Sequence, residues 1–322
     1  MPKSSKKKAL ITGITGFAGS HLVELLLKEN VEVHGVQRWR SKDDNITHLI
    51  NKISCHEADL LDAHSLYKVI DEVRPSFIFH LAAQSYVQSS WYSPANTLEV
   101  NVIGTVHLFE AVRKSGLNIP IQIACSSEEY GKVEKDELPI KETNPLRPLS
   151  PYAVSKLAMD YLGYQYFKSY GMKIIRTRGF NHTGPRRGDV FAESNFAKQI
   201  AEIEKGKRDP IVQVGNIEAV RDYTDVRDMV RAYYLSVQKC KPGEVYNIAS
   251  GKGWKIKDVL DILLSKTKLK IKIVQDKNRM RPSDVEVLIG DASKYMKQTG
   301  WKPEIPFEKT MEDLLDYWRQ VV

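Results

Sequence analysis

The chain has 322 residues, of which 42% are hydrophobic and 27% charged, and its formal net charge is +8 at pH 7. This composition indicates a globular protein with one large core or two domains. No apolar run approaches the ~18 residues that a membrane span requires, and the basic residues form neither an RNA-binding nor a helix-turn-helix signature. We therefore expect no membrane and no nucleic-acid partner.

The N-terminal stretch is basic and then apolar, as in a signal peptide, but Gly13, Gly16 and Gly19 interrupt its apolar part. We therefore expect no signal peptide. The three cysteines lie far apart in the sequence, which is typical of a cytoplasmic protein without disulfides. Since the sequence contains neither a CxxC nor an HExxH motif, we expect no metal site.

The first half of the chain alternates short apolar runs with amphipathic stretches. The runs predict strands at 9–12, 31–36, 76–82, 119–125 and 172–178, and the amphipathic stretches predict helices at 17–30, 65–73, 98–116 and 151–171. Strands separated by helices of this length indicate an α/β fold with a parallel, doubly wound sheet of the Rossmann type.

After Arg178 the alternation weakens. Helices are predicted at 194–206, 223–238 and 307–320, and a strand at 244–249. We expect a nucleotide-binding domain of residues 1–178, to which 223–250 return, and a smaller C-terminal lobe of 179–222 and 251–322. Ligands of such sheets bind in the crevice beyond the carboxyl ends of the strands.

The segment GITGFAG (13–19) lies between the first predicted strand and the first predicted helix. Its glycines have the spacing GxxGxxG rather than GxGxxG. They allow the backbone to turn tightly and approach a pyrophosphate, while the helix N-terminus supplies N–H groups and a partial positive charge. A tight turn without a ligand is the alternative, but the strand–turn–helix context favours a dinucleotide.

The second predicted strand leads into Gln37, Arg38, Trp39 and Arg40, where an NAD-binding protein would have an acid for the ribose. Arginine suits a 2′-phosphate because its guanidinium forms bidentate hydrogen bonds. We therefore expect NADP, with NAD possible; the alternative is that both arginines are simply exposed. Asp59 could contact the adenine or cap a helix.

The segment SPYAVSK places Tyr152 and Lys156 four residues apart at the start of a predicted helix, so that they share one face. A nearby ammonium group lowers the pKa of a tyrosine, which can then act as a base near neutral pH. Exposed Tyr and Lys at this spacing are common, so the pair alone is a weak signal. It becomes strong when combined with the glycine turn and a serine after an intervening strand.

This combination resembles the extended short-chain dehydrogenase/reductase family over nearly the whole chain. The resemblance implies a nicotinamide cofactor, a nucleotide-sugar substrate and a Ser-Tyr-Lys triad, whose hydroxyl falls on Ser126 when counted back from Tyr130-Gly131. HLAAQ (80–84) matches the segment on the nicotinamide side. The implied cofactor residues are Gly13, Thr15, Gly16, Phe17, Ala18, Gly19, Arg38, Arg40, Asp59, Leu60, Leu81, Ala82, Ala83, Gln84, Tyr152, Lys156 and His182.

Longer motifs resemble the branch of this family that contains GDP-mannose 4,6-dehydratases and GDP-4-keto-6-deoxymannose reductases. The motifs are AAQSYV, SPYAVSK, FNHTGPRRG, GNIEAVRDYTDV and RPSDVEVLIGDASK. The resemblance implies that Asn181, Arg221 and Arg281 face the substrate nucleotide, and arginines suit a pyrophosphate. Each arginine could instead be a surface or interdomain residue. Ser85, Ser126 and Asn195 complete the expected substrate set.

The segment SSEEYG (126–131) bears on which reaction is catalysed. In the dehydratases that it resembles, a glutamate stands two residues after the triad hydroxyl, and here it is Glu128. Elimination of water requires such a general acid/base. Strand-like alternation would place the next acid, Glu129, at the surface.

Other features resemble the reductase, which uses NADPH on a 4-keto carbon and does not need Glu128. They are Phe17-Ala18 in the glycine turn, serine rather than threonine at 126, and the short KIVQDKNRMRP segment. PRRG (185–188) favours the dehydratase. Because of Glu128 we expect a GDP-mannose 4,6-dehydratase, with the reductase as the alternative. A 4-epimerase, another GDP-sugar such as a heptose, and a binding protein with an inactive site are further alternatives.

The resemblance also implies a homodimer or homotetramer, in which helices 98–115 and 152–170 form a four-helix bundle between subunits. Tyr161, Leu162 and Tyr166 are candidate contacts, and each could instead belong to the core of one chain.

Overall fold

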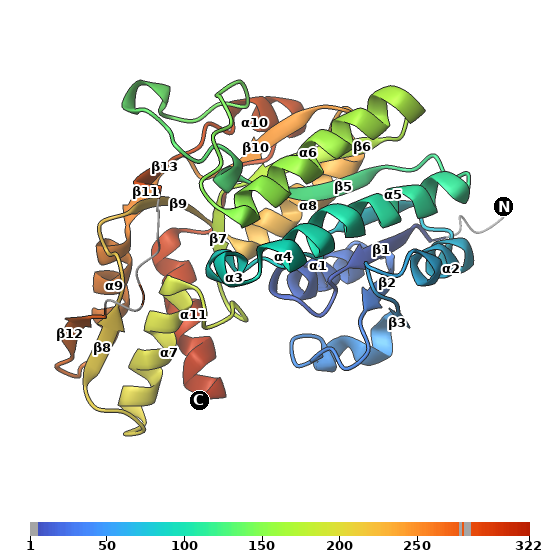
Figure 1. Ribbon diagram of the computed structural model, residues 1–322. Helices are drawn as coiled ribbons and strands as arrows, with labels where there is room; N and C mark the ends of the chain where they lie inside the picture. Colours follow the sequence, from blue (N-terminus) through green and yellow to red (C-terminus); the bar gives the residue numbers. More distant parts are fainter. Residues whose placement is uncertain (1–5, 277–278, 280–284) are drawn as a thin grey trace.

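The computed structural model describes residues 6–276, 279 and 285–322 (Figure 1). Its centre is a sheet of seven parallel strands in the order β3-β2-β1-β4-β5-β6-β10. These strands are β1 (Lys8–Thr12), β2 (Glu32–Gln37), β3 (Ser54–Glu57), β4 (Phe77–His80), β5 (Ile121–Ser126), β6 (Ile174–Gly179) and β10 (Val245–Ile248). The predicted doubly wound α/β fold is therefore confirmed.

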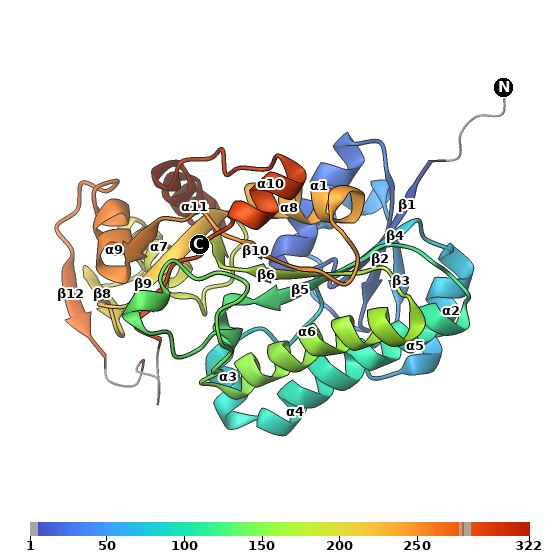
Figure 2. The same ribbon diagram turned by 90° about the horizontal axis from the view of Figure 1, so that it is seen from above.

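Helices cover both faces of this sheet, as Figure 2 shows. Helices α1 and α8 pack on one face with α10, and helices α2, α5 and α6 pack on the other. Their bounds are α1 (Phe17–Lys28), α2 (Ala63–Val73), α5 (Gly104–Lys114), α6 (Pro151–Tyr170), α8 (Val226–Lys239) and α10 (Ser293–Thr299). The strand order reverses between β1 and β4, and a doubly wound sheet binds ligands at such a point.

The sequence defines the ends of the long helix α6. Ser150 is the N-cap, and its hydroxyl accepts a hydrogen bond from the Ala153 N–H at 3.1 Å. Pro151 occupies the first helical position, where its missing N–H costs nothing. Gly171 ends the helix with φ of 68°, a left-handed conformation that glycine adopts readily.

The predicted helix at 98–116 is less regular than expected. It consists of α4 (Pro94–Leu98), a π-helical turn over Glu99–Ile103 and α5. The π turn contains the buried Asn101. Such turns occur frequently at functional sites. Helix α3 (Val87–Tyr92) precedes α4, and short 3-10 helices lie at Thr47–Lys52, Ser127–Glu129 and Lys135–Glu137.

The C-terminal lobe is built on a second, smaller sheet. Strand β9 (Val220–Asp225) pairs with β11 (Gly253–Lys255), β13 (Val287–Leu288) and β7 (Asn181–Thr183). A separate pair joins β8 (Ile211–Val214) to β12 (Lys272–Gln275). Helices α7 (Ala192–Glu204), α9 (Ile256–Leu264) and α11 (Phe307–Val321) share one apolar core beside these strands. The sequence predicted α7 and α11 but assigned residues 223–225, which end β9, to a helix.

The chain crosses between the sheet domain and the lobe several times. Helix α8 and strand β10 return to the sheet domain, where residues 223–250 were expected. Residues 285–301, which the sequence-based division assigned to the lobe, contribute Leu288, Ala292, Tyr295 and Trp301 to the same core as α1 and α8. Among the described residues, no helix has both the length and the apolar character needed to cross a membrane.

Candidate active site

The predicted Ser-Tyr-Lys residues lie together at the carboxyl end of β5. Ser126 is the last residue of that strand, and Tyr152 and Lys156 lie on the first turns of α6. Lys156 Nζ donates to the Ala124 carbonyl at 2.7 Å and lies 5.9 Å from the centre of the Tyr152 ring. All three side chains are buried. The fold alone therefore brings Ser126, Tyr152 and Lys156 together.

The pKa of Tyr152 is shifted in the direction opposite to the sequence-based expectation. Burial raises the pKa of Tyr152, an interaction with the Ser126 hydroxyl lowers it, and the charge of Glu128 raises it further. The prediction that Lys156 would lower this pKa is wrong for the protein alone, because the cost of removing a phenolate from water exceeds the lowering by Ser126 and Arg187. Burial also lowers the pKa of Lys156, opposed by Cys125 and Glu129.

The two adjacent acids of SSEEYG have different environments. Glu128 is half-buried, and its N–H donates to the Ser126 hydroxyl at 3.2 Å. Glu129 is completely buried, so the prediction that it lies at the surface is wrong. Residues 127–129 form a 3-10 turn in which Ser126 is the N-cap, and the alternation of a strand does not continue into it. Glu128 therefore faces the site, and Glu129 lies beneath it.

The glycine turn forms a cradle of backbone beside this group. Gly13 has φ of 75°, and a side chain there would come within 2.9 Å of the Ala82 backbone. Gly19 is equally confined, since a Cβ atom would lie 2.3 Å from the Gly13 carbonyl oxygen. Gly16 is the N-cap of α1 and has no side chain to occupy the helix N-terminus. The turn thus leaves N–H groups open to an anion, as a pyrophosphate requires.

A chain of buried hydrogen bonds joins the glycine turn to helix α6. His80 bonds to the Thr12 hydroxyl at 2.8 Å and to the Thr105 hydroxyl at 3.0 Å. Thr105 donates to the Asn101 carbonyl, and Asn101 Nδ2 donates to the Ser155 hydroxyl at 2.8 Å. Burial lowers the pKa of His80 to about 3, so the ring is neutral.

Asn101 also fixes the segment after β4. Its Oδ1 accepts from the Gln84 N–H at 2.8 Å, and its Nδ2 reaches the Gln84 carbonyl at 3.1 Å. Leu81 and Ala82 donate their N–H groups to the Thr12 carbonyl and hydroxyl at 3.3 and 3.2 Å. Residues 81–84, predicted to line the nicotinamide side, therefore lie against the glycine turn. Sequence reasoning did not identify Asn101 or His80, although His80 begins the HLAAQ motif.

Aromatic and cationic side chains close the opposite side of the cradle. His182 stacks on Phe17 with 6.0 Å between ring centres and 8° between planes. Burial and the charge of Arg187 lower the pKa of His182 to about 4. The Arg187 guanidinium lies 5.1 Å from the Phe17 ring centre and 3.3 Å from that of Phe191. Thr15 and Ala18 are half-buried in the turn below.

Arg187 is a site residue that sequence reasoning missed. It lies 3.5 Å from Glu193, and burial lowers the pKa of its guanidinium. Its charge in turn lowers the pKa of Tyr152. Its neighbour Arg186 points away and binds Glu24 on α1, at 2.7 and 3.0 Å. The PRRG motif contains both arginines, but the sequence could not show that Arg187 faces the site and that Arg186 binds Glu24.

The end of the cradle expected to bind the ribose phosphate is exposed. Arg38, Trp39 and Arg40 all lie at the surface beyond β2, and Arg40 stacks on Trp39 at 4.1 Å. Asp59 caps its own turn by accepting from the Leu61 N–H at 2.9 Å. Leu60 is buried, and its carbonyl contacts His107 Nδ1 at 2.8 Å.

The residues expected to bind substrate lie mainly in the lobe. Asn181 on β7 is half-buried, and Arg221 on β9 is buried. Arg221 Nη1 donates to the Val220 carbonyl at 2.9 Å. Asn195 accepts from Arg279 at 2.8 Å and donates to the Asp189 carbonyl at 2.9 Å. Ser85 is exposed in the loop after β4, and Arg281 lies outside the described residues.

Comparison with known proteins gives consistent matches. The family model described as GDP-mannose 4,6 dehydratase matches residues 10–314. A GDP-mannose 4,6-dehydratase of Yersinia enterocolitica is 35% identical in an alignment of 350 positions that covers 96% of this chain and 93% of that protein. A GDP-6-deoxy-D-mannose reductase of Pseudomonas aeruginosa is 33% identical over 316 positions, covering 98% of each chain. The solved structure of RMD from Pseudomonas aeruginosa complexed with NADPH has a TM-score of 0.87 and 32% identity, covering 98% of this chain and 100% of that one.

Proposed function

The chain belongs to the GDP-mannose 4,6-dehydratase family of enzymes, and from this premise we propose that it converts GDP-mannose, or a closely related GDP-sugar, to the 4-keto-6-deoxy sugar. Glu128 is the observation that carries the proposal. Its backbone N–H donates to the Ser126 hydroxyl, and the charge of its carboxylate raises the pKa of Tyr152. Reduction of a ketone needs a proton donor of the Tyr152 type, whereas elimination of water needs an additional acid/base such as Glu128.

Each proposed catalytic residue has one task. Tyr152 takes the proton from the sugar O4 while Ser126 holds that oxygen, and Arg187 and Lys156 provide the positive charge that favours the phenolate. NADP⁺, held by the glycine turn and Lys156, would supply the hydride acceptor for C4 and the hydride donor for C6. Glu128 removes the C5 proton, which the 4-keto group has made acidic, and gives it to the C6 hydroxyl as water leaves. C5 regains a proton, which balances the one that Tyr152 removed from O4.

We propose NADP as the cofactor, with NAD as the alternative. The confined glycine turn, whose backbone lies against Ala82, suits the pyrophosphate. Arg38 and Arg40 suit a 2′-phosphate because their guanidinium groups are exposed and can reorient toward it. The NADPH in the related Pseudomonas structure supports the same preference.

We assign the cofactor to residues 1–178 with 223–250, and the sugar nucleotide to 179–222 and 251–322. The separate core beside α7, α9 and α11 supports a distinct lobe. Within it, we propose that Asn181, Asn195, Arg221 and Arg281 bind the nucleotide, and that Ser85 contacts the sugar from the sheet domain.

We further propose a cytoplasmic homodimer or homotetramer formed through the helices around α5 and α6. Tyr161 is 56% exposed and suits such a contact. Tyr166 is a less suitable candidate, because it is buried against Phe109 and donates to Glu110 at 3.0 Å. Leu162 packs against the core of its own chain.

The reductase is the second candidate, and chain length favours it. The alignment with the Pseudomonas reductase spans 316 positions, against 350 for the Yersinia dehydratase and 322 residues here. The dehydratase therefore contains segments that this chain lacks. As a reductase, the protein would use Ser126, Tyr152 and Lys156 to protonate the O4 of a 4-keto sugar, and Glu128 would have no required role.

The deciding experiment incubates the protein with GDP-mannose and a catalytic amount of NADP⁺, followed by mass spectrometry of the sugar nucleotide. We expect the loss of one water per sugar with no net change in cofactor. Glu128→Gln should slow this loss by about 100- to 10,000-fold, the usual contribution of a general acid/base. Stoichiometric NADPH oxidation with the 4-keto-6-deoxy sugar, and no water loss from GDP-mannose, would instead identify the reductase.

A further inference from the structure

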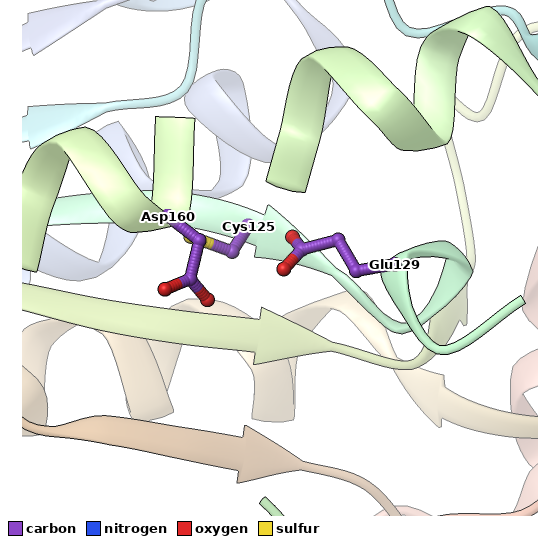
Figure 3. Close-up of side chains that lie close together, drawn as sticks. All are labelled: Cys125, Glu129 and Asp160. Atoms are coloured by element: carbon purple, nitrogen blue, oxygen red, sulfur yellow. The ribbon is translucent and has the colours of Figure 1, made fainter. Parts of the chain in front are cut away.

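A group of buried ionisable side chains lies directly beneath the Ser126–Glu128 turn. Figure 3 shows three of them, Cys125 at the end of β5, Glu129 in the 3-10 turn and Asp160 on α6. Arg176 and Arg178 reach the group from β6. All five side chains are buried, and the proposed mechanism uses none of them.

The hydrogen bonds of this group are unevenly distributed. Asp160 accepts from Arg178 Nε at 2.8 Å and also from Arg176. Glu129 Oε1 accepts from the Ser126 N–H at 2.8 Å. Arg178 Nε lies 3.3 Å from Glu129 Oε2 but directs its hydrogen toward Asp160. Within the described part of the chain, Glu129 Oε2 has no hydrogen-bond partner.

A metal ion does not explain this arrangement. The Cys125 sulfur and one oxygen from each acid lie within 4.8 Å of one another, a spacing that a cation could use. However, two guanidinium groups already bind Asp160, and the charge of Lys156 interacts with Cys125 and Glu129. A further cation would be repelled by all three. Burial and the charges of Asp160 and Glu129 also raise the pKa of Cys125, which keeps its thiol protonated and a poor ligand.

A proton between the two acids explains the arrangement better. A fully buried carboxylate with an oxygen that accepts no hydrogen bond is costly, and two adjacent buried carboxyl groups do not readily ionise together. A proton on Glu129 Oε2 would give that atom a hydrogen bond to Asp160. In agreement, burial and then the charge of Asp160 raise the pKa of Glu129 well above its usual range, although Arg178 opposes them.

We propose that Glu129 and Asp160 share one proton and act as a positioning pair that holds the Ser126–Glu128 turn against helix α6. The connection runs from α6 through Asp160 to Glu129, and from Glu129 Oε1 to the Ser126 N–H. Asp160 lies one turn beyond Lys156 and two turns beyond Tyr152 on the same helix. The pair therefore fixes the distance between the hydroxyl of Ser126 and the phenol of Tyr152. This inference rests on the proposed function.

The test compares Glu129→Gln with Glu129→Leu. A glutamine keeps both contacts, because its carbonyl can accept from Ser126 and its NH₂ can donate to Asp160. We expect Glu129→Gln to retain nearly wild-type kcat. Glu129→Leu loses both contacts, and kcat should fall by about 100-fold, the usual result of misplacing a catalytic group by about 1 Å. The KM of both variants should stay unchanged, because Glu129 does not touch the substrate.

The matched control is the same substitution one residue earlier. Glu128→Gln should slow elimination by about 100- to 10,000-fold, as predicted above, while leaving the backbone of the turn unchanged. Hydrogen exchange, resolved to the single amide of Ser126 within residues 121–131, reports the Ser126 N–H. We expect protection in the wild type, Glu129→Gln and Glu128→Gln, and its loss in Glu129→Leu. If Glu129→Leu does not fold, Glu129→Gln still decides the question, because it should fold and keep both kcat and the protection of the Ser126 N–H.

Two results would overturn the proposal. If Glu129→Gln loses kcat and thermal stability as severely as Glu129→Leu, then Glu129 acts as a carboxylate and no proton is shared. If Glu129→Leu keeps both kcat and the protection of residues 121–131, then the pair positions nothing. Failure of the proposed function is recognised separately, because the exchange experiment requires no substrate, and the wild type would then leave GDP-mannose unchanged.

Discussion

The two ends of the cofactor cradle differ in how the chain holds their side chains. Around Tyr152 and Lys156, side chains are buried and hydrogen-bonded to one another or to the backbone. Around Arg38 and Arg40, they are exposed on the loop that follows β2. The packing of the whole domain positions the side chains around Tyr152 and Lys156. Only the loop after β2 positions Arg38 and Arg40. We therefore predict that substitutions at the loop change which cofactor binds without disturbing the proposed catalytic residues.

The strongest test of this difference is Tyr152→Phe at the buried end. Removal of one hydroxyl should lower kcat by about 1,000-fold, within the usual range for a general acid/base. The melting temperature should hardly change, because the ring remains to fill its buried position. Turnover and thermal melting of the same preparations measure both quantities. Residual activity within tenfold of the wild type would mean that another group carries the O4 proton.

Stability at mildly acidic pH should depend on the same buried end. The pKa of His80 is lowered to about 3, so between pH 6.5 and 5 only the unfolded chain gains a proton at this residue. The free energy of unfolding should therefore decrease as the pH is lowered, by about 1.6 kcal/mol over this interval from His80 alone. Urea unfolding at both pH values, with His80→Gln for comparison, measures the difference.

Other titrating groups contribute equally to the wild type and to His80→Gln, so the two slopes differ only by the His80 part. Equal slopes would mean that His80 is protonated in the folded protein, and that the buried end is more hydrated than its contacts indicate.

At the exposed end, Arg40→Ala and Arg38→Ala should each weaken NADPH binding by about tenfold, as expected for the loss of a hydrogen bond between charged groups. Binding of NADH and kcat at saturating cofactor should not change, because these arginines lie far from the buried end. Fluorescence titration with both cofactors provides the measurement. An equal loss for NADH would show that the arginines do not read the 2′-phosphate.

The smallest effect is expected for Trp39→Ala. Arg40 stacks on this ring, and such contacts at exposed sites contribute about 0.5–1 kcal/mol. NADPH affinity should fall by two- to fivefold in consequence, with the melting temperature unchanged, since Trp39 is 68% exposed. The same titration and a thermal melt are sufficient. A marked loss of stability would contradict the view that this end is held only by its own loop.

The sequence predicted the sheet domain well, because its strands and helices are long enough to show their periodicity. It missed most of the lobe, since β7, β11 and β13 have only two or three residues each and pair with a distant β9. The π-helical turn around Asn101 could not be predicted either, because its residues are as typical of an α-helix as their neighbours.

The site was predictable where a motif names the residue type, as for Ser126, Tyr152 and Lys156. Glu129 was wrongly predicted to be exposed, because side chains alternate between two faces only as far as the strand continues. The sequence does not show that the strand ends at Ser126. Arg187 required the three-dimensional structure, since only the fold distinguishes it from Arg186, which binds Glu24.

The core of the lobe has a consequence for synthesis on the ribosome. Trp318 on α11 donates to the Ser194 hydroxyl on α7, 124 residues earlier in the chain. At about 5–20 residues per second, a ribosome needs about 6–25 s to make the intervening segment. During this time the apolar surfaces of α7 and α9 that pack against α11 remain uncovered. The nascent chain should therefore depend on chaperones in this interval, and a chain that stops before α11 should aggregate.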